Sequence, residues 1–155
     1  MVRWIDGFYG GLIAGVTSAL FFLIVTVAWL HDTTPGGFFA QIAQALPPFH
    51  TAPPLAPLVV LGVALYFLVA TGFGIVYAAL ARRLSSMWRA PTSVMWGLCY
   101  GLLVWWILND VVVPATGAVV DRPLWEGLVG TVVFYGVVLS ELMTVAHRRG
   151  AGASP

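Results

Sequence analysis

Four apolar runs, each long enough to cross a lipid bilayer, leave this chain one class of fold. The first, over residues 8–30, carries no acidic or basic side chain, and as a helix it would be about 34 Å long, more than the roughly 30 Å of a hydrocarbon core. The chain is 60% hydrophobic and only 8% charged, whereas soluble domains carry about 25% charged residues. The sequence therefore predicts an all-α integral membrane protein with four transmembrane helices in an up-down bundle, spanning residues 8–30, 55–80, 92–113 and 124–145.

One transmembrane domain over residues 1–150 uses nearly the whole chain, and a small-residue tail follows at 151–155. The apolar part of a cleaved signal peptide is about 7–15 residues long. The first run is longer than that, so we expect it to be retained as a membrane helix.

The arginines predict how this bundle is oriented. With four spans, the two termini and the loop at 81–91 share one side, and that side holds every arginine except Arg122: Arg3, Arg82, Arg83, Arg89, Arg148 and Arg149. Basic residues in short loops favour the cytoplasmic side. All basic residues are arginine, a bias that we attribute to a GC-rich bacterial genome. We predict cytoplasmic termini in a multi-pass protein of the bacterial inner (plasma) membrane.

The segment between the first two spans, residues 31–54, predicts a short helix that lies in the membrane interface. Thr34 is a suitable N-cap, and Pro35 suits the first helical position, where its missing N–H does no harm. The alternative is an ordered loop that rests on the end of the bundle. Apolar side chains recur in this segment at helical spacing: Phe38, Phe39, Ile42, Ala45 and Leu46.

Small residues mark the places where the helices are expected to pack, because they let backbones approach closely in a membrane. They gather in the cytoplasmic halves of the first three spans, while aromatic side chains fill the outer halves. We therefore expect helices that pack tightly at the cytoplasmic end of the bundle and splay apart at its outer end. The splayed end is either filled by its own aromatic side chains or forms an outward-facing groove for a lipid tail, a hydrophobic ligand or a partner helix. The packing positions are Gly7, Gly11, Gly15, Gly74, Gly97, Gly101 and Gly130.

The third span presents a second face opposite its glycines. On a helical wheel, Trp96, Leu103 and Trp106 lie nearly opposite Gly97 and Gly101. If the glycine face packs inside the bundle, the tryptophan face meets either lipid or another protein.

Three acidic residues, Asp110, Glu126 and Glu141, are the candidates for a polar site. Glu141 is the most interior of them, and the helical wheel predicts that it points into the bundle. We expect it to pair with Arg82, Arg83 or Arg3 near the headgroups. A proton or cation site is the alternative, although transport needs further titratable groups through the core.

The outer surface collects His31, His50, Asp110 and Glu126 with other acids, a set that includes ligand types for a divalent ion. Their spacing matches no metal-ligand motif, so we expect no metal. A bis-histidine haem needs histidines within facing helices, and here they lie in loops or at helix ends.

Catalytic motifs are absent from the chain. It contains no phosphate loop and no nucleophile–base pair, and its single cysteine, Cys99, excludes disulfides and paired-cysteine metal sites. We expect no enzymatic activity, no cofactor and no nucleic-acid partner.

Two features suggest relationships within and beyond the chain. The first and third spans both carry GxxxG early and a polar pair late, which is typical either of a duplicated helical hairpin or of any four-helix protein with this orientation. The stretches GGLIAGVTSAL, TGFGIVYAAL and WGLCYGLLVWWILNDVVVPATG resemble the small bacterial inner-membrane proteins of the YagU-like type. This resemblance implies a four-helix inner-membrane protein and brings no established catalytic residues.

Two functions fit these observations. The first is a non-catalytic accessory or structural subunit that packs against a larger inner-membrane complex, such as a respiratory or photosynthetic one, or that associates with itself. The second is a small-molecule or lipid-binding membrane protein that uses the outward groove, with Glu126 and Asp110 at its mouth.

Overall fold

The computed structural model describes residues 3–30, 33–49, 56–88, 92–116 and 124–152, and these residues form helices joined by short connections. Four helices are long and apolar enough to cross a membrane: Trp4–Trp29, Ala56–Arg83, Thr92–Thr116 and Leu124–Arg149. This confirms the predicted all-helical chain with four apolar helices. Three of the helices extend further at their charged ends than predicted, because arginine side chains can reach toward water while their backbone stays helical.

Three of the four spans change from α to π geometry along their length. The first consists of α1 (Trp4–Leu23) and η1 (Ile24–Trp29), and the second is the continuous helix α3 (Ala56–Arg83). The third comprises α4 (Thr92–Trp106), η4 (Ile107–Val112) and α5 (Val113–Thr116). The fourth comprises α6 (Leu124–Val129), η5 (Gly130–Val137) and α7 (Val138–Gly152). The elements η1, η4 and η5 are π-helical.

Side chains that compete for backbone carbonyls accompany two of the π segments. In η1 the Thr26 hydroxyl donates to the Phe22 carbonyl at 2.5 Å, and in η4 the Asn109 amide donates to the Trp105 carbonyl at 2.9 Å. Pro114, just after η4, has no N–H to offer to the preceding turn. Where a side-chain donor or a proline interrupts the backbone hydrogen bonds of a helix in this way, the helix can widen locally into a π segment.

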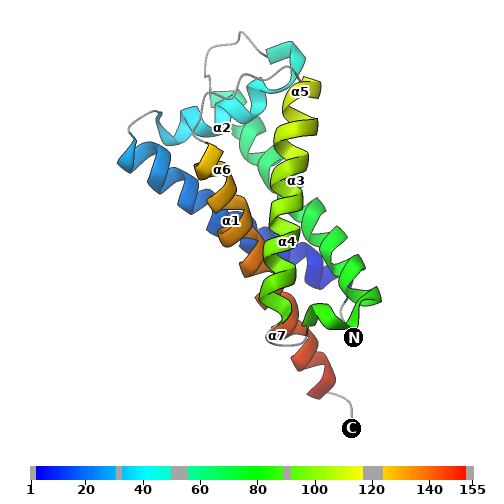
Figure 1. The fold of residues 1–155 in the computed structure, drawn as a ribbon. Coiled ribbons are helices and arrows are strands. Elements are labelled where there is room, and N and C mark those ends of the chain that lie inside the picture. Colours follow the sequence, from blue (N-terminus) through cyan, green and yellow to red (C-terminus); the bar gives the residue numbers. More distant parts are fainter. Residues whose placement is uncertain (1–2, 31–32, 50–55, 89–91, 117–123, 153–155) are drawn as a thin grey trace.

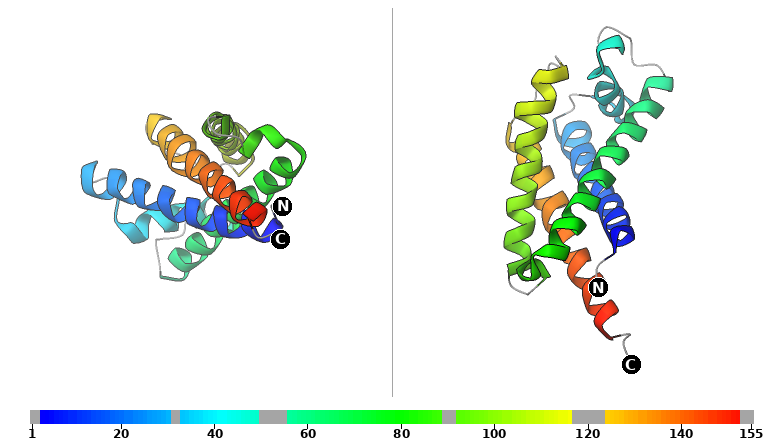
Figure 2. Two further views of the ribbon diagram at one scale, coloured as in Figure 1. Left: turned by 90° about the horizontal axis from the view of Figure 1, so that it is seen from below. Right: turned by 90° about the vertical axis from the view of Figure 1, so that its right-hand side faces the viewer.

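The chain's two ends lie at the same end of the molecule, and the spans spread apart toward the opposite end (Figure 1). Two further views show the first and second spans diverging in that direction, with the short helix α2 (Pro35–Gln44) beside them (Figure 2). The short 3-10 segments η2 (Pro47–Phe49) and η3 (Ser85–Trp88) complete the described elements.

The first and second spans meet backbone to backbone. A β-carbon on Gly11 would lie 2.6 Å from the Ala70 carbonyl oxygen and 3.0 Å from the Cα of Gly74. One on Gly7 would lie 2.7 Å from both the Ala78 side chain and the Gly74 carbonyl oxygen. No side chain fits at these distances, so glycine is what allows this contact.

The third and fourth spans repeat the same contact. A β-carbon on Gly97 would lie 2.7 Å from the Gly136 carbonyl oxygen, and one on Gly136 would lie 2.9 Å from the Cα of Gly101. Gly97, Gly101 and Gly136 thus take the parts that Gly7, Gly11 and Gly74 take in the first hairpin. The faint internal repeat of the sequence corresponds to two hairpins closed by the same three-glycine contact.

The helix α2 fills the space between the diverging ends of the first two spans. The Thr34 hydroxyl accepts from the Gly37 N–H at 3.1 Å and caps it as predicted. Its buried Phe38 ring stacks on Phe22 at 5.8 Å and lies 6.5 Å from the Tyr66 ring. On this side, therefore, the splayed end is filled by the chain's own aromatic rings.

The two glycine contacts generate a prediction about helix packing. We expect Gly74→Ala and Gly136→Ala each to lower the free energy of unfolding by about 1–3 kcal/mol, because the added methyl group overpacks a closed backbone contact. Thermal unfolding in detergent, followed by circular dichroism, measures the effect. Gly72→Ala is the matched control, since a β-carbon there would meet nothing within 4 Å. Equal melting temperatures for the Gly72 and Gly74 variants would contradict the proposed role of Gly74.

Candidate functional site on the third span

The third span exposes more of its apolar surface than the other spans do. Only 17% of its most apolar window is buried, against 22% for the second span and 39% for the first and fourth. Trp106 is 51% exposed and Leu103 45%, and Trp96 is also exposed. The structure thus places the three residues of the predicted partner or lipid face on the outside of the bundle.

Helix geometry explains this exposure. Gly97, Gly101 and Val104 are buried, because the fourth span packs on that side of α4. Helices α3 and α4, in contrast, meet through side chains: the Tyr100 hydroxyl donates to the Phe73 carbonyl, and the Tyr77 and Tyr100 rings are in contact. With one close neighbour, α4 leaves its opposite face to whatever surrounds the bundle.

A shallow hollow of about 420 Å³ lies on this exposed face, lined by Cys99, Leu102, Leu103, Trp105 and Trp106. Cys99, the chain's only cysteine, is a free, exposed thiol. A second shallow hollow lies on the outside of α1. Neither opens into the splayed end of the bundle. This face of the third span can make apolar contacts, and the Cys99 thiol is its one reactive group among the residues that line the hollow.

Asp110 and Glu126 do not share a surface. Asp110 is exposed in η4, whereas Glu126 is fully buried at the start of α6. The neighbouring Gly127 packs under the Trp105 indole, since its β-carbon would lie 3.1 Å from the indole nitrogen. The structure therefore differs from the prediction that both acids stand at the mouth of one groove, because the first turn of α6 is turned toward α4.

Glu141 also differs from its predicted position. It is exposed, and its Oε1 accepts a hydrogen bond from the buried Ser93 hydroxyl at 3.1 Å. No ion pair joins it to an arginine among the described residues. The helical wheel assumed 100° per residue through Gly130–Val137, but a π segment turns less per residue. Glu141, which follows η5, therefore faces a different direction from the one that Gly130 predicts.

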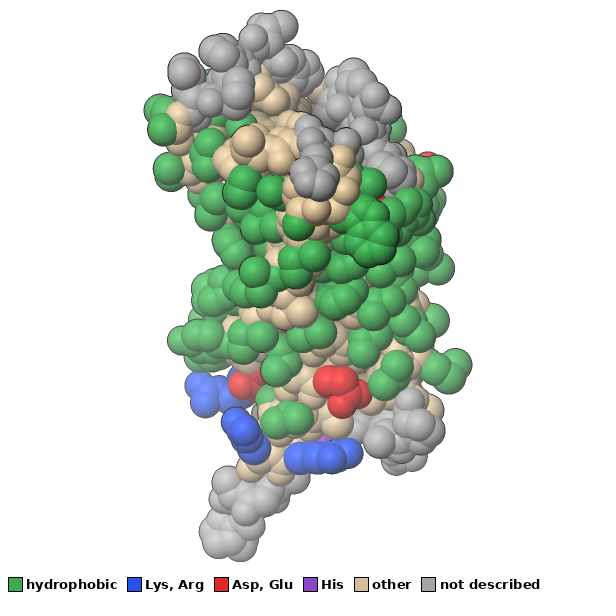
Figure 3. Space-filling view, turned by 90° about the vertical axis from the view of Figure 1, so that its left-hand side faces the viewer, with side chains coloured by type: hydrophobic (Ala, Val, Ile, Leu, Met, Phe, Trp, Pro, Cys, Tyr) green, Lys and Arg blue, Asp and Glu red, His purple; other side chains and the backbone are tan. Residues whose placement is uncertain are grey.

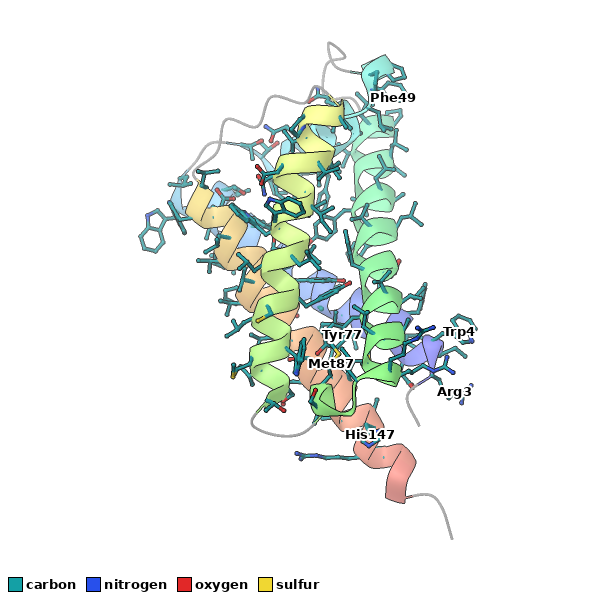
Figure 4. The ribbon with its side chains drawn as sticks, turned by 45° about the vertical axis from the view of Figure 1, so that its right-hand side comes forward. Arg3, Trp4, Phe49, Tyr77, Met87 and His147 are labelled. Carbon is teal, nitrogen blue, oxygen red and sulfur yellow. The ribbon has the colours of Figure 1, made fainter. Side chains whose placement is uncertain are left out.

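The outer polar cluster falls largely outside the described residues. His31, Asp32, His50, Asp121 and Arg122 belong to segments that the structure does not describe. Within the described ranges, no three His, Cys, Asp or Glu side chains come together. His147 lies near the termini, far along the chain from the outer set (Figure 4).

Buried and partly buried tyrosines are the interior feature that sequence reasoning missed. Tyr135 donates its hydroxyl to the Ala70 carbonyl at 2.5 Å, Tyr100 donates to the Phe73 carbonyl at 2.6 Å, and Tyr66 donates to the Gly15 carbonyl at 3.0 Å. Each bond joins two different spans. The signal that could have found them is a phenol within an apolar run, since a buried hydroxyl needs an acceptor.

Tyr77 is the exception among these tyrosines. It is fully buried, and its ring meets the Tyr100 ring edge-on at 4.9 Å. Its hydroxyl has no hydrogen-bond partner among the described residues. Figure 4 shows Tyr77 inside the bundle near Met87 of η3. Tyr77 therefore contributes packing, whereas Tyr66, Tyr100 and Tyr135 also connect helices.

Comparisons with protein-family models, with curated proteins and with solved structures return no significant match. The resemblance to YagU-like proteins stays a prediction.

The tyrosines generate a prediction in which one substitution is made at two buried positions. We expect Tyr135→Phe to lower the free energy of unfolding by about 0.5–1.5 kcal/mol, because it removes a bond between spans. Tyr77→Phe should leave the free energy of unfolding unchanged or raise it, because the Tyr77 hydroxyl makes no hydrogen bond to a described residue that the substitution could remove. Thermal unfolding in one detergent compares the two variants. Greater destabilisation by Tyr77→Phe would show that its hydroxyl is satisfied in the protein.

Proposed function

We propose that this protein is a non-catalytic accessory or structural subunit that packs laterally against a larger complex of the bacterial inner membrane. The observation that carries the proposal is the hollow on the exposed face of the third span, between Cys99, Leu103 and Trp106. This surface is apolar, is built from large side chains and is exposed in the part of the chain that the structure describes.

Membrane packing gives the physical reason. Lipid tails are as apolar as leucine, so helices associate in a bilayer through van der Waals contact and hydrogen bonds. A hollow loses contacts unless atoms fill it. A side chain of a partner helix has a fixed position and can fill the hollow beside Trp106. Mobile lipid tails fill the same space less completely.

The proposed membrane orientation rests on the arginines. Arginine side chains stand at the end of the molecule that carries the termini, below a belt of hydrophobic side chains (Figure 3). Basic residues favour the cytoplasmic side, so the termini face the cytosol in this proposal. The helix α2 then lies at the outer surface, in the membrane interface.

The alternative, a groove for a lipid or small molecule, gains no specific observation. Phe38 of α2 is buried between Phe22 and Tyr66 at the splayed end, where the groove was expected. The lateral interface is therefore the function that we carry forward.

The orientation generates its own prediction. A green fluorescent protein fused after Pro155 should fluoresce in intact bacteria, because it folds in the cytosol, and alkaline phosphatase at the same position should be inactive. Active phosphatase with dark fluorescent protein would reverse the orientation.

Cys99 permits a direct test of the interface. A photoreactive maleimide on Cys99, illuminated in native membranes, should attach the chain to a second membrane protein at high yield. The matched control moves the single cysteine to another exposed apolar position in Cys99→Ala, Leu68→Cys, since Leu68 is 68% exposed on α3. The reaction product is identified by its mass after affinity purification.

The adducts distinguish the outcomes. A partner captured from Cys99 but not from position 68 supports the lateral interface. A product of twice the chain mass would show that the protein associates with itself at this face rather than with a larger complex. Lipid adducts alone from both positions would overturn the proposed function.

A further inference from the structure

The tight contact between the first two spans leads to a pair of like charges at one end. Gly7 packs against Ala78 and Gly74. One turn further toward this end, Arg3 precedes Gly7 and Arg82 follows Ala78, because the two helices run antiparallel. Arg3 is the N-cap residue of α1 and Arg82 lies in the last turn of α3, so both belong to the same end of this helix pair. Both side chains are exposed.

Neither guanidinium group is neutralised by a described carboxylate. Asp6, three residues after Arg3, accepts a hydrogen bond from the backbone N–H of Arg3 at 2.6 Å, and it thereby caps α1. None of the described arginines at this end, which are Arg3, Arg82, Arg83, Arg148 and Arg149, forms an ion pair with another described residue. Two cations at the same end of a helix pair repel each other, and an anion between them would relieve that repulsion.

An apolar hollow of about 360 Å³ begins directly beside this cationic end. Trp4, Ile5, Phe8 and Tyr9 line it, on the side of α1 that packs against no other span. Trp4 is 61% exposed and Tyr9 59%, and the rings of Phe8 and Tyr9 meet edge-on at 5.6 Å. Figure 4 shows Arg3 and Trp4 next to each other, pointing away from the bundle.

We infer that this place binds an anionic phospholipid, with its phosphate between Arg3 and Arg82 and an acyl chain in the hollow lined by Trp4 and Tyr9. Guanidinium groups bind phosphate oxygens through paired hydrogen bonds. The indole of Trp4 suits the boundary between headgroups and hydrocarbon. The combination of a cationic end with an apolar hollow is what selects a lipid over a soluble anion.

The site is independent of the proposed lateral interface. It lies on the first and second spans, whereas the hollow around Cys99 lies on the third. If one of the two proposals fails its test, the other can therefore still be tested.

Native mass spectrometry of the full chain in a mild detergent tests this inference. Equal amounts of dioleoyl phosphatidylglycerol and dioleoyl phosphatidylcholine are added, and the retained adducts are compared. We expect phosphatidylglycerol to be preferred by at least roughly 30-fold, the effect of two arginines at a membrane surface. The double variant Arg3→Gln, Arg82→Gln should lose that preference.

The matched control is Arg148→Gln, Arg149→Gln, which removes the same charge from the exposed end of α7. It should keep the lipid preference. Melting temperatures without added lipid should agree between the two double variants, which shows that both are folded. A third variant, Tyr9→Ala, should weaken phosphatidylglycerol binding although it carries no charge.

Three results would overturn the inference. Equal retention of the two lipids would show that no headgroup is selected. Equal losses in the two double variants would reduce the effect to net charge. Displacement of the lipid by millimolar glycerol 3-phosphate would assign the arginines to a soluble phosphate.

Discussion

The structure depends on two places where helix backbones touch. Gly74 lies against Gly7 and Gly11, and Gly136 lies against Gly97 and Gly101. In lipid there is little hydrophobic force between helices, so close van der Waals contact has to hold the spans together. Because three glycines meet in each hairpin in the same way, the chain is assembled from two similar units.

The two hairpins pack against each other more closely on one side than on the other. The first and fourth spans pack directly, and the Ser18 hydroxyl of α1 donates to the Gly130 carbonyl of η5 at 3.0 Å. Between the second and third spans, tyrosines take the place of backbone contact: Tyr100 reaches the Phe73 carbonyl at 2.6 Å. This inequality leaves the third span with one close neighbour, and its outer face becomes the surface on which the proposed lateral interface rests.

The arginines that the structure describes lie at the end of the molecule that carries the termini. Figure 3 shows arginine side chains at that end, below the hydrophobic side chains that cover the middle of this face. Within that frame the interior still holds polar groups, and most of those described are bonded: Tyr66, Tyr100 and Tyr135 donate to carbonyls of other spans. The two proposed sites differ accordingly, since one is an apolar contact surface and the other joins a cationic end to an apolar hollow.

The sequence by itself determined the class of the protein, its four membrane-length helices and the N-cap at Thr34, because apolar run length, glycine spacing and capping chemistry are local properties. Only the tertiary structure decided where the acids point. Glu126 is buried because the first turn of α6 faces α4, and Glu141 is exposed because it follows a π segment, through which a helical wheel drawn at 100° per residue no longer holds. It also decided that Tyr135 and Ala70 meet, since a contact between residues 65 positions apart depends on how whole helices cross.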